Sequence, residues 1–114
     1  MEGATTPRNL EELVRRTNEV GLEYVAARKV CDRLELMRST EKARALNRHD
    51  DGSHSEAKLR RLAELDPEYI AFLEKLSQAR GDMEKARLRY DSYKNLFEAR
   101  RSMLSYQKAE MQLL

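Results

Sequence analysis

The sequence contains no tryptophan, one cysteine, two prolines and four glycines among 114 residues. Because Cys31 is the only cysteine, the chain cannot form an internal disulfide, which excludes a disulfide-stabilised secreted domain and favours a reducing compartment. The scarcity of proline and glycine, together with abundant Ala, Glu, Leu, Lys and Arg, argues against a sheet. The composition therefore predicts long helices.

Long apolar segments are absent as well. No stretch approaches the roughly 18 apolar residues that a membrane-spanning helix needs, and Met1 to Asn9 lack the apolar run of a signal peptide. Charged residues make up 37% of the chain and the mean hydropathy is −0.83, so there is too little apolar material for a large compact core. We expect a soluble, cytoplasmic protein with a single helical domain over residues 1–114.

Apolar residues recur at alternating steps of three and four in the C-terminal half, with charged residues in most of the gaps. These positions are Tyr69, Phe72, Leu76, Ala79, Met83, Ala86, Tyr90, Tyr93 and Phe97. The spacing keeps one face of a helix apolar for about eight turns, as in a coiled coil or a long helical hairpin. It predicts a helix over about 67–111, capped by Asp66 and with Pro67 in its first position.

A second long helix is expected over about 9–46. Asn9 and Glu12 have capping-box spacing, although Thr6 followed by Pro7 offers an earlier start. Its apolar face consists of Leu10, Leu13, Thr17, Val20, Tyr24, Ala27, Cys31 and Leu34. Beyond that point the register fails, and the apolar positions shift to Met37, Ala43 and Leu46.

The segment between the two long helices predicts a loop and one short helix. Residues 47–55 are rich in turn formers and lack apolar residues, so we expect a loop there. A short helix follows over about 56–65, capped by Ser53 or Ser55. The predicted fold class is therefore all-α, a long antiparallel, coiled-coil-like helical hairpin with a short middle helix.

Two helices leave much of each apolar face partly exposed to water, so the hairpin is expected to assemble into a homo-oligomer. The expected oligomer interface follows the C-terminal apolar positions: Tyr69, Phe72, Leu76, Met83, Tyr90, Phe97 and Leu104.

Residues that could carry out catalysis are scarce. His49, Asp50, Asp51 and His54 form the one cluster that resembles metal ligands, but their spacing matches no standard zinc pattern, and a solvated turn is the preferred interpretation. Cys31 lies on an apolar face and is interpreted as a small buried residue. No phosphate-binding glycine loop and no Ser-His-Asp arrangement occur. We predict no enzyme, no metal and no cofactor.

Basic residues gather in two segments although the net charge is only +2. Residues 28–48 carry seven basic and three acidic side chains, and residues 80–101 carry seven and four. Arginine can pair with phosphates and tyrosine can stack on exposed bases, which favours single-stranded nucleic acid as the ligand. The candidate binding residues are Arg80, Arg87, Arg89, Lys94, Arg100, Arg101 and Lys108.

Other interpretations apply to the same residues. Arg100 and Gln107 fall where the apolar pattern expects a hydrophobic side chain, and polar residues at such positions commonly specify register or oligomeric state. Tyr90 and Tyr93 also lie on the apolar face, so their rings are equally candidates for the core. Glu98 and Glu110 dilute the basic charge near the C-terminus, and no membrane binding is expected.

The stretch from Leu65 to Met111 resembles a group of small helical proteins encoded by phages. The resemblance is carried by Asp66, Pro67, Tyr69, Leu73, Ala79, Arg80, Ala86, Arg87, Tyr90, Phe97, Glu98, Arg101, Ser102, Ser105, Glu110 and Met111. Its most distinctive part is Phe-Glu-Ala-Arg-Arg-Ser at residues 97–102. In layout these proteins are similar to the UvsY-type recombination mediators, which are small, helical and oligomeric.

This resemblance implies two kinds of partner besides the homo-oligomer. One is single-stranded DNA, and the other is a RecA-like recombinase together with a single-strand binding protein, in the host cytoplasm if the chain is phage-encoded. Two functions therefore stay open: a non-catalytic recombination mediator, or a coiled-coil structural or adaptor protein that binds partner helices without nucleic acid.

Overall fold

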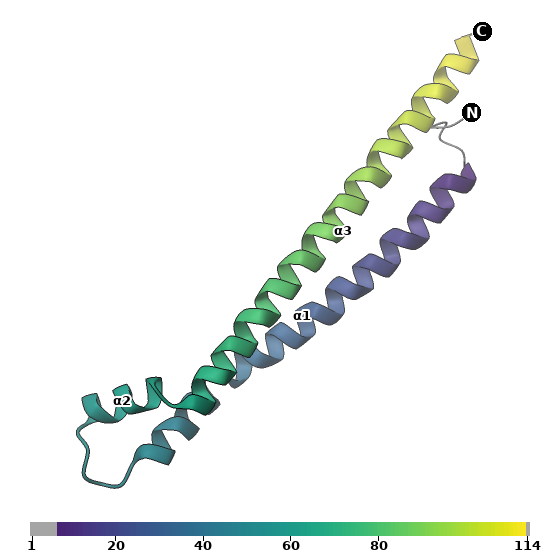
Figure 1. The fold of residues 1–114 in the computed structure, drawn as a ribbon. Helices are drawn as coiled ribbons and strands as arrows, with labels where there is room; N and C mark the ends of the chain where they lie inside the picture. The colour runs from purple at the N-terminus through teal and green to yellow at the C-terminus, as the bar shows by residue number, and fades with distance from the viewer. Residues whose placement is uncertain (1–6, 114) are drawn as a thin grey trace. The chain divides into compact units, whose positions relative to one another are not determined.

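The computed structural model describes residues 7–113, and all of its regular structure is helical (Figure 1). Helix α1 spans Pro7–His49, α2 spans Glu56–Glu64 and α3 spans Pro67–Leu113, with no strand among the described residues. The all-α class with two long helices and a short middle one is thereby confirmed. Over the same residues, no helix combines the length and apolar character that crossing a membrane requires.

Three helix ends differ from the predicted ones by two or three residues, and α2 ends at Glu64, one residue before its predicted end. Helix α1 begins at Pro7, before the predicted Asn9, and Thr6 lies outside the described residues. It also continues to His49, so the predicted loop at 47–55 is too long and the connection covers residues 50–55. Basic side chains in the last turn favour this extension, because they interact with the negative end of the helix dipole. Helix α3 extends to Leu113, beyond the predicted 111.

The caps of the two later helices follow the predicted residues. Of the two serines proposed for α2, Ser55 is the N-cap, and its side chain accepts a hydrogen bond from the Lys58 backbone N–H at 3.3 Å. The hydroxyl of Ser53 instead donates to Asp51. Asp66 caps α3 as predicted, because its Oδ1 accepts from the Tyr69 backbone N–H at 2.9 Å.

Contacts group the chain into two compact units, which are described separately. Among the described residues, unit 1 contains residues 7–26 and 84–113, and unit 2 contains residues 27–83. A single domain over residues 1–114 stays a prediction.

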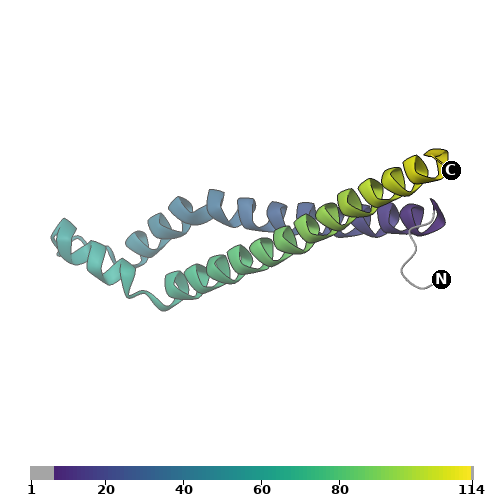
Figure 2. The same cartoon turned by 90° about the horizontal axis from the view of Figure 1, so that it is seen from above.

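Unit 1 consists of two helical segments that run antiparallel (Figure 2). Arg16 lies over the ring of Tyr93, and Glu23 accepts a hydrogen bond from Arg89 at 2.8 Å, so rising numbers on α1 pair with falling numbers on α3. The predicted α1 positions are the sheltered ones here. Only Val20, however, is nearly inaccessible, with 1% of its surface exposed. Two helices alone therefore leave the apolar faces of unit 1 partly exposed, as expected.

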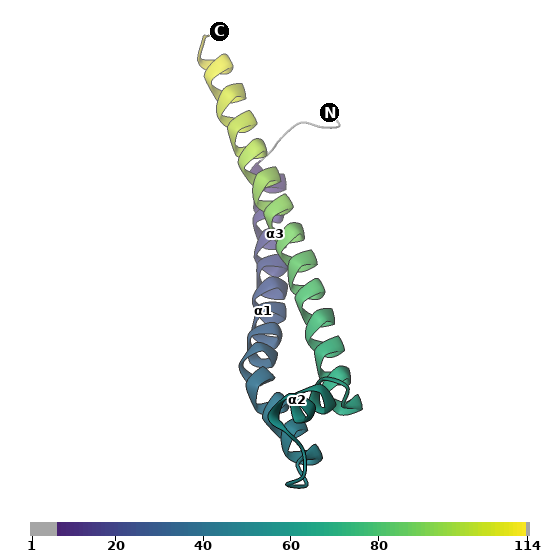
Figure 3. The same ribbon diagram turned by 90° about the vertical axis from the view of Figure 1, so that its left-hand side faces the viewer.

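Unit 2 has the better-buried core, where α2 packs near the end of α1 and the start of α3 (Figure 3). Ala45 and Ala63 are fully buried against Tyr69. Their small side chains permit close approach of the helices. The predicted shift of the α1 apolar face to Ala43 is wrong, because Ala43 is exposed and Ala45 takes the core position.

A polar contact closes the same end of unit 2. Arg48 donates to both carboxylate oxygens of Asp66, at 2.6 and 3.2 Å, and the Nε2 atom of His49 lies 2.9 Å from Oδ2. These bonds join the last turn of α1 to the N-cap of α3. The hydrogen bonds from Arg48 and from the Tyr69 N–H hold the pKa of Asp66 well below its usual range.

Candidate nucleic-acid interface

All seven predicted nucleic-acid-binding residues lie on α3, but they do not form one surface. Arg80 belongs to unit 2 and the other six belong to unit 1. Within unit 1, four of the six follow one another at steps of seven: Arg87, Lys94, Arg101 and Lys108. We call these four residues the basic column.

The basic column occupies one side of the helix. Seven residues make nearly two turns of an α-helix, so each step of seven rotates the side-chain direction by only about 20°. The column therefore extends for about 32 Å along α3 at 1.5 Å per residue. A line of cations of this length matches a polyanion better than a small ligand.

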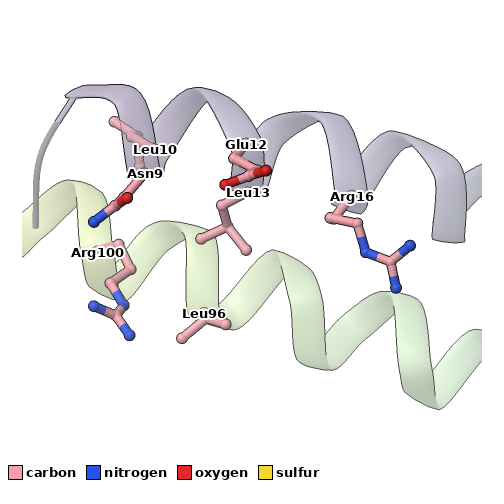
Figure 4. Close-up of a pocket in the computed structure, with 7 residues that line it drawn as sticks. All are labelled: Asn9, Leu10, Glu12, Leu13, Arg16, Leu96 and Arg100. Carbon is pink, nitrogen blue, oxygen red and sulfur yellow. The ribbon is translucent and has the colours of Figure 1, made fainter. Parts of the chain in front are cut away.

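Arg89 and Arg100 lie away from the column. Arg89 donates to Glu23 of α1 at 2.8 Å. Arg100 is half-buried and lines a groove of about 300 Å³ between the two helical segments of unit 1, with Leu10, Leu13 and Leu96 (Figure 4). Its position fits the alternative interpretation, a polar residue at a packing position.

Carboxylates neighbour the first half of the basic column. Arg87 pairs with Glu84 at 2.7 Å and Lys94 with Asp91 at 3.3 Å, each within one turn of α3. In the described part of the chain, Arg101 and Lys108 have no ion pair. The C-terminal half of the column therefore carries the least compensated positive charge.

These ion pairs are weak obstacles to a phosphate. The four side chains of Glu84, Arg87, Asp91 and Lys94 are about half exposed. Exposed ion pairs typically contribute at most about 1 kcal/mol. A phosphate can therefore replace either carboxylate at small cost.

Arg80 is held in unit 2 by a different partner. Its Nε donates to Glu35 of α1 at 2.5 Å, and this bond lowers the pKa of Glu35. The pair links α1 to α3 within unit 2. Among the candidates, Arg80 thus has an evident structural role.

The tyrosines that suggested base stacking are used mainly in packing. Tyr90 is half-buried, with its ring stacked on Tyr24 at a centroid distance of 6.0 Å and Lys94 4.7 Å above it. Tyr93 lies under Arg16, whose hydrogen bond lowers the pKa of the phenol. The alternative interpretation of these two rings as packing residues fits the structure.

Tyr106 is the exposed aromatic of this region, at 67%. It follows Arg101 by five residues, which places it about 140° around an ideal α-helix from the basic column. The column and Tyr106 therefore do not share a binding surface. Tyr106 therefore offers no stacking surface beside the basic column.

The residues predicted for the oligomer interface face the chain's own helices in both units. Tyr69 and Leu76 are buried in unit 2, where Phe72 and Met83 are half-buried. In unit 1, Tyr90, Phe97 and Leu104 are half-buried as well. Much of this surface is therefore covered within one chain.

The four residues that resembled metal ligands in the sequence, His49, Asp50, Asp51 and His54, do not gather in one place. His49 contacts Asp66, whereas His54 lies 3.6 Å from Asp51. Over residues 7–113 no group of three or more His, Cys, Asp and Glu side chains is arranged to hold a metal ion. Cys31 is buried, at 3% exposure, in agreement with its interpretation as a small core residue.

Two features were missed in the sequence. Arg48 and His49 contact Asp66 from 18 and 17 positions away in the sequence, and no local pattern predicts such a contact. The seven-residue spacing of the basic column was visible in the sequence and could have been found by counting.

Comparison with known proteins adds no relative: no family model matches the chain, and neither a curated protein nor a solved structure matches it.

Proposed function

We propose that this protein is a non-catalytic, single-stranded-DNA-binding protein of the recombination-mediator type, with the basic column of α3 as its phosphate-binding surface. The single observation that supports this proposal is the alignment of Arg87, Lys94, Arg101 and Lys108 on one side of a helix. Repeated cations on a rigid helix can follow a phosphate backbone without base readout, which suits a protein that must bind any sequence.

The mediator role adds a second activity to DNA binding. Following the resemblance to UvsY-type proteins, the protein would help a RecA-like recombinase to assemble on DNA coated by a single-strand binding protein. It would supply binding energy and proximity, and no chemistry of its own.

Charge reversal in the basic column tests the DNA-binding proposal. Arg101→Glu with Lys108→Glu removes the two cations that have no carboxylate partner in the described chain. The matched control is Lys29→Glu with Arg33→Glu, which changes the net charge equally at exposed residues of unit 2. Fluorescence anisotropy of a labelled single-stranded oligonucleotide should show at least a tenfold loss of affinity for the first variant only. Equal losses in both variants would indicate nonspecific attraction and would refute the column.

The second candidate function is a structural or adaptor protein that binds helices. It is favoured by the ion pairs of Arg80, Arg87, Arg89 and Lys94, which show that many arginines and lysines already serve the fold. It is also favoured by large apolar side chains on the outside of α3, including Leu88 at 62% exposure. Under this function wild-type protein should not bind single-stranded DNA even at low salt.

A further inference from the structure

Helix α3 carries a second, uncharged and largely apolar stripe in unit 1, beside the face that packs on α1. It consists of Ser92, Leu96, Ala99, Met103, Tyr106 and Leu113, at steps of three, four and seven. We call it the outer stripe. Its large members are exposed, with Leu96 at 42%, Met103 at 46% and Tyr106 at 67%. The packing against α1 therefore leaves most of the stripe uncovered, although Leu96 also lines the groove with Leu10 and Leu13.

The outer stripe differs from the surfaces described above except at Leu96, which borders the groove of unit 1. The residues that pack on α1 in this part of α3 include Phe97 and Leu104, each one position after Leu96 and Met103 and so about 100° around the helix. The basic column lies farther around the helix from the stripe, since Arg101 and Tyr106 are about 140° apart. A partner on the outer stripe would leave the basic column accessible.

Charge is nearly absent from this side of the helix. The outer stripe and four further residues on the same side of α3, Asn95, Ser102, Ala109 and Glu110, make ten residues with one charge, Glu110. A chain with 37% charged residues would place about four charges among ten positions. A solvated helix face gains nothing from such depletion, whereas the centre of a protein interface is typically poor in charge.

We propose that the outer stripe pairs with the outer stripe of a second copy of this chain, with the two α3 helices antiparallel about a two-fold axis near Ala99. In this register Leu96 of one copy meets Met103 and Tyr106 of the other. The small side chains of Ser92, Ala99 and Ser102 allow the two helices to approach closely.

The charges at the two ends of the outer stripe specify the direction. Lys85 and Arg89 are basic and lie before its first residue, whereas Glu110 is acidic and lies near its last. Antiparallel pairing brings Glu110 of one copy to within about one turn of Lys85 or Arg89 of the other, twice by symmetry. Parallel pairing would oppose like charges at both ends.

The size of the contact predicts a modest affinity. About an axis near Ala99 the two stripes overlap from Ser92 to Tyr106, a length of about 21 Å, and a helix presents a strip about 10 Å wide, which gives on the order of 200 Å² per copy. This is below the area of a standard stable interface. We therefore expect a dimer that dissociates in the micromolar range.

Sedimentation equilibrium of the full-length protein without DNA tests the pairing. Leu96→Glu with Met103→Glu should raise the dimer dissociation constant at least tenfold, whereas the control Leu22→Glu, at an exposed α1 residue of unit 1, should not change it. Because the substituted side chains are exposed, the helix content measured by circular dichroism should be unchanged. A wild-type monomer at 100 micromolar, as an order-of-magnitude upper concentration for micromolar affinity, would refute the proposal. A dimer insensitive to the double substitution would also refute it.

Disulfide crosslinking in a Cys31→Ala background tests the direction independently of folding defects. Ala99→Cys should crosslink to itself, because residue 99 lies near the two-fold axis. Ser92→Cys and Tyr106→Cys should crosslink when the two variants are mixed, because residue 92 of one copy lies opposite residue 106 of the other. Neither variant should crosslink alone, since each residue lies about 20 Å along the helix axis from the same residue of the second copy. Self-crosslinking of Tyr106→Cys at the rate of Ala99→Cys would show parallel pairing and refute the model. Neither experiment uses DNA, so failure here is separable from failure of the proposed function.

Discussion

The Arg48 guanidinium donates hydrogen bonds to both carboxylate oxygens of Asp66, from Nη2 to Oδ1 at 2.6 Å and from Nε to Oδ2 at 3.2 Å. Arg48 is in the last turn of α1, and Asp66 is the N-cap of α3, with only 6% of its side chain exposed. The Asp66 carboxylate thus accepts hydrogen bonds both from the first turn of its own helix, α3, and from the last turn of α1.

Removal of this carboxylate should destabilise unit 2. Asp66→Ala loses the cap on the Tyr69 N–H and leaves Arg48 without its principal partner, so we expect the thermal unfolding midpoint to fall by roughly 5–10 °C at pH 7. Asp66→Asn retains a capping oxygen but loses the charge, so its unfolding midpoint should lie between those of Asp66→Ala and the wild type. Circular dichroism at 222 nm measures both midpoints, and an unchanged midpoint for Asp66→Ala would contradict the role given to this contact.

Acid should weaken the protein through the same residue. The pKa of Asp66 is depressed in the folded state, mainly by the hydrogen bond from Arg48, so the folded protein binds this proton less readily than the unfolded chain. The stabilisation is therefore present above the unfolded value, about 3.9, and is lost as the pH falls below it. Urea midpoints between pH 6 and pH 2 should decline less in Asp66→Asn than in the wild type. Parallel declines would argue against Asp66 as a main source of acid sensitivity.

Two glycines inside long helices should respond differently to alanine. At Gly81 an added Cβ meets nothing within 4 Å, so Gly81→Ala should stabilise by about 0.5–1 kcal/mol through helix propensity. At Gly21 the added Cβ would lie 3.0 Å from Cε1 of Tyr90, whose ring is stacked on Tyr24. Gly21→Ala should therefore stabilise less than Gly81→Ala in chemical denaturation. Equal stabilisation by the two substitutions would mean that the Tyr90 ring can shift without loss of stability.

Tyr106 should separate the two proposed surfaces of α3. Because it lies about 140° from Arg101 on an ideal helix, Tyr106→Ala should leave the affinity for single-stranded DNA within about twofold of wild type. The same substitution should weaken the dimer severalfold, since the side chain is part of the outer stripe. A large loss of DNA affinity in protein held as a monomer by dilution would show that stacking on Tyr106 matters after all.

Periodicity predicted the helices well because packing spacing is local information. The steps of three and four from Tyr69 to Phe97 and from Leu10 to Leu34 lie on the sheltered sides of α3 and α1. The Asp66 cap and the Ser55 cap were also predicted, since each depends on residues within one turn. Ala43 was chosen wrongly for the core because α2 determines which alanine is buried, and its packing is not visible in the pattern of α1 alone.

The candidate site was harder to predict because charge and aromatic content do not reveal direction around a helix. Seven basic residues were selected, yet only four share one side of α3 in unit 1, and Arg80 and Arg89 pair with Glu35 and Glu23 across the helices. These partners lie 45 and 66 positions away in the sequence, so only the fold brings them together.

The most direct test of the proposed function is the anisotropy of a labelled single-stranded oligonucleotide titrated with wild-type protein at several salt concentrations, with a duplex of equal length as control. Four phosphate contacts by the basic column predict tight single-strand binding, and the logarithm of the binding constant should fall against the logarithm of salt with a slope of about −3. Duplex should bind more weakly. Absence of single-strand binding at low salt, or affinity independent of salt, would contradict the account and leave the helical adaptor function in its place.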